Sequence, residues 1–197
     1  MHGSLVAQHN VGMAFARGWP PCEQSDRKAA TWFRKAAEAG YAPAQFSLGI
    51  CYSAGKGVAQ DTRATFEWYS RAAAQGFAKA QHNLALCYDF GKGVSADATR
   101  AFEWYGKAAA QGYAQAQCNL GFCCMQGAGV EKNPSLAVEW FVRAAEQGFA
   151  EAQFNLGSCL ERGVGVGEDR AKAVACYRKA AAQGDEDAIA ALARLRE

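Results

Sequence analysis

Two serine–lysine pairs are the residues of this sequence that most resemble catalytic groups. Ser25-Asp-Arg-Lys28 and Ser53-Ala-Gly-Lys56 match the Ser-x-x-Lys spacing of hydrolases of the β-lactamase type. That chemistry needs the serine at a helix start, with the lysine one turn later on the same face. Ser53 instead lies where a helical pattern ends, and Gly55 breaks the turn before the lysine. The companion Ser-Asp-Asn and Lys-Thr-Gly motifs are missing from the sequence, so we predict no enzyme and keep such a hydrolase as the alternative.

Phosphate-binding and metal-binding patterns are equally weak. Gly55-Lys-Gly57 and Gly91-Lys-Gly93 are too short for a phosphate-binding loop, and they follow helical patterns rather than strands. A zinc site needs clustered ligands, whereas the three histidines are scattered, at His2, His9 and His82. We therefore predict neither a metal nor a cofactor.

The strongest signal is a repeat with a period of 36 residues. The series Gln45, Leu48, Gly55, Asp61 and Trp68 returns as Gln81, Leu84, Gly91, Asp97 and Trp104. A period in this range indicates stacked supersecondary units. We predict an all-α fold, a right-handed α-solenoid of helix-turn-helix repeats with a superhelix like that of tetratricopeptide repeats. It forms one domain, 1–197, with units 4–40, 41–76, 77–112, 113–148 and 149–184 and a capping helix at 185–197.

Each repeat contains two helical patterns, which we call the first and second helix. Ala44, Leu48 and Tyr52 form one apolar face of a first helix. Gly49 lies inside this helix at a cost of about 1 kcal/mol, which close packing of an aromatic ring from the second helix would offset. We expect first helices at 5–17, 42–54, 78–90, 114–126 and 150–162, and second helices at 26–39, 62–75, 98–111, 134–147 and 170–183.

Two local features complete the expected repeat. Asp61, Asp97, Asn133 and Asp169 stand where the N-cap of each second helix should accept a backbone N–H. Trp104 and its equivalents are expected to be the large buried aromatic residues of the core, with Cys176 taking that place in the last repeat.

Composition narrows the classes of partner and compartment. Net charge is +2, from 21 basic and 19 acidic residues without a basic block, which argues against nucleic acid binding. No apolar run approaches the length of a transmembrane helix, and the first residues lack the pattern of a signal peptide. We expect a monomer in the cytoplasm, and the sequence leaves open whether a leader was removed.

The cysteines support a reducing compartment. Four of the eight occupy one repeat position, namely Cys51, Cys87, Cys123 and Cys159. Equivalent positions in stacked helices lie about 8–10 Å apart, which is too far for a disulfide. We therefore expect these four to be small core residues and all eight to be free thiols.

The repeated spacing resembles the Sel-one-like repeat (SLR) family, relatives of the tetratricopeptide repeats. It reads Ala-x-Ala-Gln-x-x-Leu-Gly-x-x-Tyr-x-x-Gly-x-Gly-Val, followed by Asp, Trp-Tyr and Ala-Ala-x-x-Gly, and covers essentially the whole chain. Members of this family are scaffolds or adaptors that bring proteins together, so the resemblance implies a non-catalytic role in protein binding. In secreted cysteine-rich members of the family, a disulfide joins the two helices of each repeat. This chain has one recurrent cysteine per repeat instead of two, so a secreted relative is only an alternative.

By analogy with tetratricopeptide repeats, a protein or peptide ligand would bind a concave groove lined by the first helices. The groove positions carry apolar residues that the core does not require. The predicted groove residues are Phe46, Ile50, His82, Asn83, Leu86, Phe90, Asn119, Phe122, Met125, Phe154 and Asn155. Two alternatives stay open: the aromatic rings could pack between neighbouring helices, and the asparagine amides could bind within the protein instead of to a peptide backbone.

Overall fold

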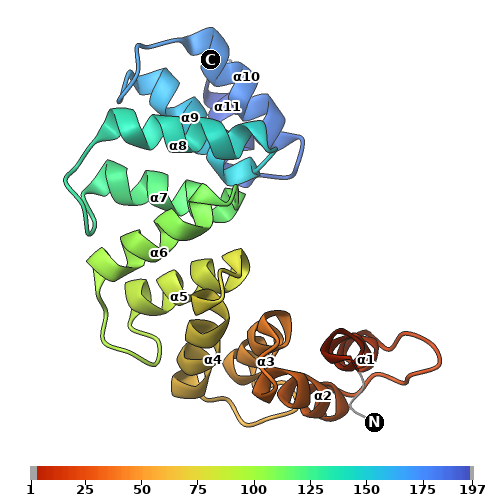
Figure 1. Ribbon diagram of the computed structural model, residues 1–197. Coiled ribbons are helices and arrows are strands. Elements are labelled where there is room, and N and C mark those ends of the chain that lie inside the picture. The colour runs from red at the N-terminus through yellow and green to blue at the C-terminus, as the bar shows by residue number, and fades with distance from the viewer. Residues whose placement is uncertain (1–3, 196–197) are drawn as a thin grey trace. The chain divides into compact units, whose positions relative to one another are not determined.

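The computed structural model describes residues 4–195, and this range contains eleven α-helices and no strand (Figure 1). The first helices are α1 (Leu5–Arg17), α3 (Ala42–Ala54), α5 (Ala78–Phe90), α7 (Ala114–Gln126) and α9 (Ala150–Arg162). The second helices are α2 (Asp26–Glu38), α4 (Thr62–Ala74), α6 (Ala98–Ala110), α8 (Pro134–Glu146) and α10 (Arg170–Ala181). A last helix, α11 (Glu186–Arg194), follows. The all-α repeat fold is confirmed, and no helix in this range is long and apolar enough to cross a membrane.

Helix boundaries agree closely with the sequence pattern. All five first helices match their predicted bounds, and the second helices end one or two residues early. The Asp61 and Asn133 side chains accept the expected N-cap hydrogen bonds, from the amides of Ala64 (2.9 Å) and Leu136 (3.0 Å). The predicted capping helix is shorter than 185–197, and its last two positions lie outside the described residues.

The chain divides into two compact units, and the boundary falls inside the third repeat. Unit 1 contains α1–α5 and extends to Asp97, whereas unit 2 contains α6–α11 and begins at Ala98. The expectation of one continuous domain stays a prediction.

Each unit is built on contacts between a helical glycine and an aromatic ring. Gly49 of α3 is buried, and a Cβ there would lie 2.5 Å from the Tyr69 ring of α4. Gly157 of α9 has the same relation to Tyr177 of α10, at 2.8 Å. These contacts confirm that the glycine permits close approach of an aromatic residue, as the sequence predicted.

The identity of that aromatic residue corrects the sequence prediction. Tyr105 is fully buried, whereas Trp104, which we expected in the core, is only half-buried. The Lys107 ammonium lies 3.7 Å from the centroid of the Trp104 ring. Neighbouring residues on a helix point about 100° apart, so only one of the two can face the first helix. In each second helix this is the residue after the tryptophan, or after Cys176 in α10.

Glutamine side chains connect successive repeats. Gln45 of α3 is buried and donates to the carbonyl oxygen of Ala37 at the end of α2 (3.1 Å). Gln75, just after α4, donates in turn to Oε1 of Gln45 (2.7 Å). Unit 2 repeats the arrangement with Gln147 and Gln117 (2.8 Å). Because a buried amide needs its partners, these bonds hold neighbouring repeats in register.

Candidate partner-binding clefts

Unit 1 contains two clefts at equivalent repeat positions, each between two first helices and the second helix that joins them. Cleft A lies among α1, α2 and α3, and cleft B lies among α3, α4 and α5. Their volumes are about 180 Å³ and about 120 Å³. Equivalent lining residues of clefts A and B are Phe33 and Tyr69, Ile50 and Leu86, Cys51 and Cys87, and Lys56 and Lys92.

The glycine-rich turns place a lysine beside each cleft. Gly93 has a φ of 75° and lies so close to the Thr62 carbonyl at the start of α4 that a Cβ would clash with it. Gly57 approaches the Asp26 carbonyl in the same way. Because the turn is held against the second helix, Lys56 and Lys92 line clefts A and B. Neither lysine was among the predicted groove residues, although a lysine between the two turn glycines occurs in the second and third repeats alone.

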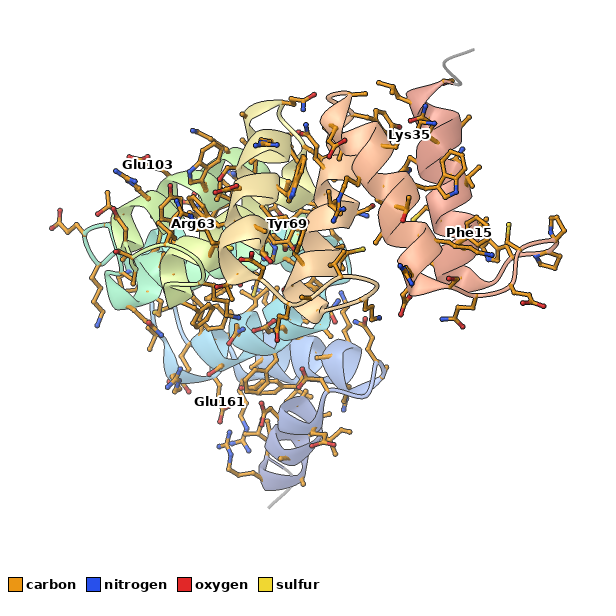
Figure 2. The ribbon with its side chains drawn as sticks, turned by 90° about the horizontal axis from the view of Figure 1, so that it is seen from below. Phe15, Lys35, Arg63, Tyr69, Glu103 and Glu161 are labelled. Carbon is orange, nitrogen blue, oxygen red and sulfur yellow. The ribbon has the colours of Figure 1, made fainter. Side chains whose placement is uncertain are left out.

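A tyrosine hydroxyl and an asparagine amide are among the polar groups of cleft B. Tyr69 lies among the helices of unit 1 (Figure 2), and burial raises its pKa to about 12, against hydrogen bonds from Asn83 and Ser53. Nδ1 of His82 lies 3.2 Å from Oδ1 of Asn83. The Asn83 amide is therefore engaged within the protein, as in the second of the two readings of the asparagine series.

Charge distinguishes the two clefts. Cleft A is lined by both Asp26 and Lys56, whereas Thr62 takes the aspartate's place in cleft B, beside Lys92. The same charged residues act on the cysteine that lines each cleft, Cys51 in cleft A and Cys87 in cleft B. Burial raises the pKa of Cys51 to about 11, with Asp26 adding to the rise and Lys56 opposing it. Burial raises the pKa of Cys87 equally, and here Lys92 alone opposes it.

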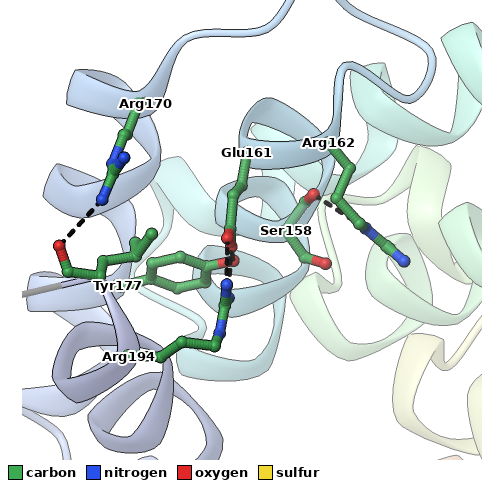
Figure 3. A network of polar contacts seen from close by, with 7 residues as sticks. Ser158, Glu161, Arg162, Arg170, Tyr177 and Arg194 are labelled. Carbon is green, nitrogen blue, oxygen red and sulfur yellow. Dashed lines mark hydrogen bonds and ion pairs between the residues drawn. The ribbon is translucent and has the colours of Figure 1, made fainter. Parts of the chain in front are cut away.

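Unit 2 has a cleft at the equivalent position among α9, α10 and α11, which we call cleft C. It is larger, about 530 Å³, and its lining contains the charged residues Glu161, Arg162, Asp187 and Arg194. Glu161 accepts a hydrogen bond from the Tyr177 hydroxyl (2.7 Å) and pairs with the two terminal guanidinium nitrogens of Arg194, at 2.7 and 2.9 Å (Figure 3). The bonds from Arg194 are the main cause of a lowered pKa for Glu161. Arg170 also donates to the Leu195 carbonyl (3.0 Å), so two arginine contacts fasten α11.

The predicted groove phenylalanines fall into two classes. Phe46, Phe122 and Phe154 are half-buried and pack on core rings of the adjoining second helix, at centroid distances of 5.7, 5.3 and 5.6 Å. Phe90 is 64% exposed, and the Lys92 ammonium lies 5.3 Å from its ring centroid. Packing against neighbouring helices therefore accounts for the first three rings, and Phe90 remains available for contact.

The other predicted groove residues also differ in accessibility. Ile50 is 40% exposed and His82 only 9%. Leu86, Met125 and Asn119 are half-buried. The Asn155 amide donates to the Glu151 carbonyl of its own helix (2.7 Å). The accessible part of the predicted groove in unit 1 is therefore Ile50, Leu86 and Phe90.

The serine–lysine pairs are not assembled for catalysis. Ser53 lines cleft B whereas Lys56 lines cleft A. The Ser25 hydroxyl accepts the Lys28 backbone amide (3.4 Å) as the N-cap of α2, and the Lys28 ammonium lies 5.3 Å from the centroid of the Phe15 ring. In residues 4–195 there is also no group of three histidine, cysteine or acidic side chains placed to hold a metal ion.

Comparisons with known proteins agree with this architecture. A Sel1 repeat protein from Oxalobacter formigenes is 32% identical with a TM-score of 0.93, over 98% of this chain and 77% of that one. A protective antigen of uropathogenic Escherichia coli with an SLR fold is 32% identical with a TM-score of 0.90, over 96% of this chain and 40% of that one. Cysteine rich protein B of Helicobacter pylori is 26% identical with a TM-score of 0.52, over 66% of this chain and 92% of that one.

The search of curated proteins finds no match. The Sel1 repeat family matches five consecutive segments, at residues 5–41, 42–77, 78–113, 114–149 and 150–185, one residue beyond the predicted units. The matched segments cover nearly the whole chain. This chain therefore belongs to the Sel1 repeat family.

Proposed function

We propose that this chain is a non-catalytic scaffold that binds a segment of a partner protein through clefts A and B of unit 1. Sel1 repeat proteins typically mediate protein–protein interaction. The proposed surface, which we call the first-helix face, carries Ile50, Leu86 and Phe90 on α3 and α5. An accessible apolar surface with nearby polar groups is the usual character of a partner site.

One observation carries the proposal: the two clefts follow each other in adjacent repeats with the same kinds of lining residue. Ile50 and Leu86 are equivalent, as are Lys56 and Lys92. These residues do not contribute to the repeated glycine–aromatic contact, yet they recur. A row of similar clefts suits an extended chain, whose side chains point away from its backbone at regular intervals.

Free thiols support the expected compartment. No disulfide joins any of the eight cysteines, all of which lie within residues 4–195, and Cys22 and Cys176 are half-buried while the others are buried. We propose that the chain works in a reducing compartment, where such thiols persist.

The proposal can be tested without knowing the natural partner. A phage library of random dodecapeptides is panned on the immobilised full chain, and selected peptides are then measured against variants. Replacing both Ile50 and Phe90 with serine should abolish binding of most selected peptides, because interface energy concentrates on a few apolar anchors. Ile189→Ser is the matched control, since Ile189 is 51% exposed but lies on α11 of unit 2.

Circular dichroism should show the helical content and the melting temperature of the double variant close to those of the parent protein. Failure to select any peptide would contradict the proposal. So would peptides that bind the double variant normally and lose binding on Ile189→Ser.

A further inference from the structure

Clefts A and B are nearly equivalent, but their net charges differ. Asp26 and Lys56 both line cleft A, where the two opposite charges compensate each other. Thr62 replaces the aspartate in cleft B, so Lys92 is the one charged residue in its lining. This difference bears on which partner segment unit 1 can bind.

Resting on the proposed function, we propose that the partner segment is a chain in the polyproline II conformation with two apolar residues three positions apart and one carboxylate beside the residue that enters cleft B. The apolar residues enter clefts A and B, and the carboxylate pairs with Lys92. The partner is thus a protein segment of acidic and apolar character.

The size and lining of the clefts favour short aliphatic side chains. Cavities of about 150 Å³ lined by apolar residues accommodate a molecule as large as benzene. Cleft A, at about 180 Å³, includes Met13, Phe33 and Ile50 in its lining, and cleft B, at about 120 Å³, includes Leu86 and the Tyr69 ring. Each cleft can therefore take one side chain of the size of leucine or valine.

The repeat sets the spacing between those side chains. Packed helices lie about 8–10 Å apart, and a chain in the polyproline II conformation advances about 3.1 Å per residue with three residues per turn. Moving from one cleft to the equivalent place in the next repeat therefore takes about three residues of the bound chain. Residues three positions apart lie on the same side of a polyproline II segment, which can therefore fill both clefts, whereas a β-strand would point them to opposite sides.

The surroundings of Lys92 favour a single carboxylate at cleft B. Within residues 4–195 no ion pair joins Lys92 to an acidic side chain, and its ammonium lies over the exposed Phe90 ring, 5.3 Å from the centroid. An ammonium shielded on one side by an aromatic ring forms a stronger ion pair than a fully solvated one. At cleft A, Asp26 would repel a second carboxylate from Lys56.

Two labelled peptides test the proposal. Each is a fluorescein-labelled dodecapeptide of glycine and serine, one with Leu-Ser-Ser-Leu-Asp at its centre and one with Asp-Leu-Ser-Ser-Leu. Together they cover both directions of the bound chain. We expect one of them to bind the chain in fluorescence anisotropy, and its Asp→Asn form to bind about tenfold more weakly, as for loss of a charge-assisted hydrogen bond.

The protein variants exploit the equivalence of the two clefts. Lys92→Gln should weaken the aspartate peptide about tenfold and leave the asparagine peptide unchanged. Thr62→Asp gives cleft B the charges of cleft A and should produce a similar loss. Asp26→Thr is the matched control at the same repeat position, and it should not weaken binding because cleft A receives no carboxylate.

The outcomes separate this inference from the proposed function. If library peptides bind and lose binding in the serine double variant, while Lys92→Gln changes nothing, the function stands and the acidic partner is rejected. If peptides whose leucines are five positions apart bind as tightly as those with leucines three positions apart, the proposed spacing is rejected. If neither the library nor the two peptides bind, the proposed function itself fails.

Discussion

Clefts B and C occupy the same position of the repeat in two different units. They share a tyrosine ring, but most of their other lining residues differ. Both rest on a tyrosine ring packed against a helical glycine, Tyr69 on Gly49 and Tyr177 on Gly157. In cleft B the surrounding groups are neutral apart from Lys92. In cleft C the tyrosine hydroxyl is bound by Glu161, which Arg194 of the last helix pairs with.

The comparison separates residues that build the repeat from residues that give each cleft its chemistry. The aromatic position recurs in all five repeats, and the helical glycine in four of them, with buried Ala85 in its place in α5. The position of Ser53 in α3 becomes Glu161 in α9, and that of Leu86 in α5 becomes Arg194 in α11. In unit 2 Glu161 and Arg194 bind each other and fasten α11, whereas Ser53 and Leu86 of unit 1 cannot form such an ion pair.

The largest effect should come from the tyrosines that both clefts share. Tyr69→Ala and Tyr177→Ala should each lower the free energy of unfolding by about 3–5 kcal/mol, because both side chains are buried on a glycine that cannot fill the space. Trp68→Ala and Trp140→Ala should cost less, about 1–2 kcal/mol, because these indoles are half-buried under an arginine. Urea denaturation measures all four. A larger loss at the tryptophans would contradict the assignment of the core.

A smaller contrast is expected between the phenylalanines on the first helices of the two units. Phe122→Ser should cost about 2 kcal/mol, because the ring packs 5.3 Å from Phe141. Phe90→Ser should change stability by no more than about 0.5 kcal/mol, since the ring is 64% exposed. Thermal melts of the two variants provide the test. Equal destabilisation would mean that Phe90 belongs to the core and is not a contact residue.

Acid should affect cleft C more than cleft B. The pKa of Glu161 is lowered from 4.5, chiefly by the hydrogen bonds from Arg194. A lowered folded-state pKa stabilises the fold above the unfolded-state value, and this stabilisation is lost as pH falls through the folded-state value. The wild-type melting temperature should therefore fall more steeply than that of Glu161→Gln below about pH 4.5.

Comparing wild type with Glu161→Gln removes the contribution of other titrating groups, which both proteins contain. One of these is Glu151, whose pKa is raised by burial. Ser53→Ala, the equivalent change in cleft B, should leave the wild-type slope intact. Parallel curves for wild type and Glu161→Gln would show that the ion pair does not stabilise α11.

The smallest difference concerns thiol reactivity. In denaturant the chain should titrate with eight free sulfhydryls without added reductant. In the native protein Cys22 and Cys176 should react first because they are half-buried, and buried Cys51 and Cys87 should react slowly because burial raises each pKa to about 11. Ellman's reagent with and without denaturant measures both. A denatured count below eight would indicate disulfides and an oxidising compartment.

Much of the fold could be predicted because residues at the ends of the helices mark the helix boundaries in each repeat. Glycines with positive φ end the first helices, and Asp61 and Asn133 cap the second ones. The burial of Tyr105 in place of Trp104 was missed because adjacent aromatic residues look alike in a periodic pattern. One signal was present: Cys176 replaces the tryptophan in the last repeat, whereas the following position is always tyrosine or phenylalanine.

The site was harder to predict because accessibility depends on what each side chain meets in three dimensions. Asn83 and Asn155 look like ligand-binding amides, yet one is used by Tyr69 and His82 and the other by the Glu151 carbonyl. Lys92 looks like an ordinary turn residue. Its place beside cleft B follows from the close approach of Gly93 to Thr62, which no local pattern reveals.

A methyl NMR titration tests the central claim, that the first-helix face of unit 1 receives the partner segment. The full chain, labelled at isoleucine and leucine methyl groups, is titrated with whichever of the two leucine–aspartate dodecapeptides binds. We predict shifts at Ile50 and Leu86 and none at Ile189 or Leu192 of α11. Shifts confined to α11, or absent from Ile50 and Leu86 at saturation, would contradict the account.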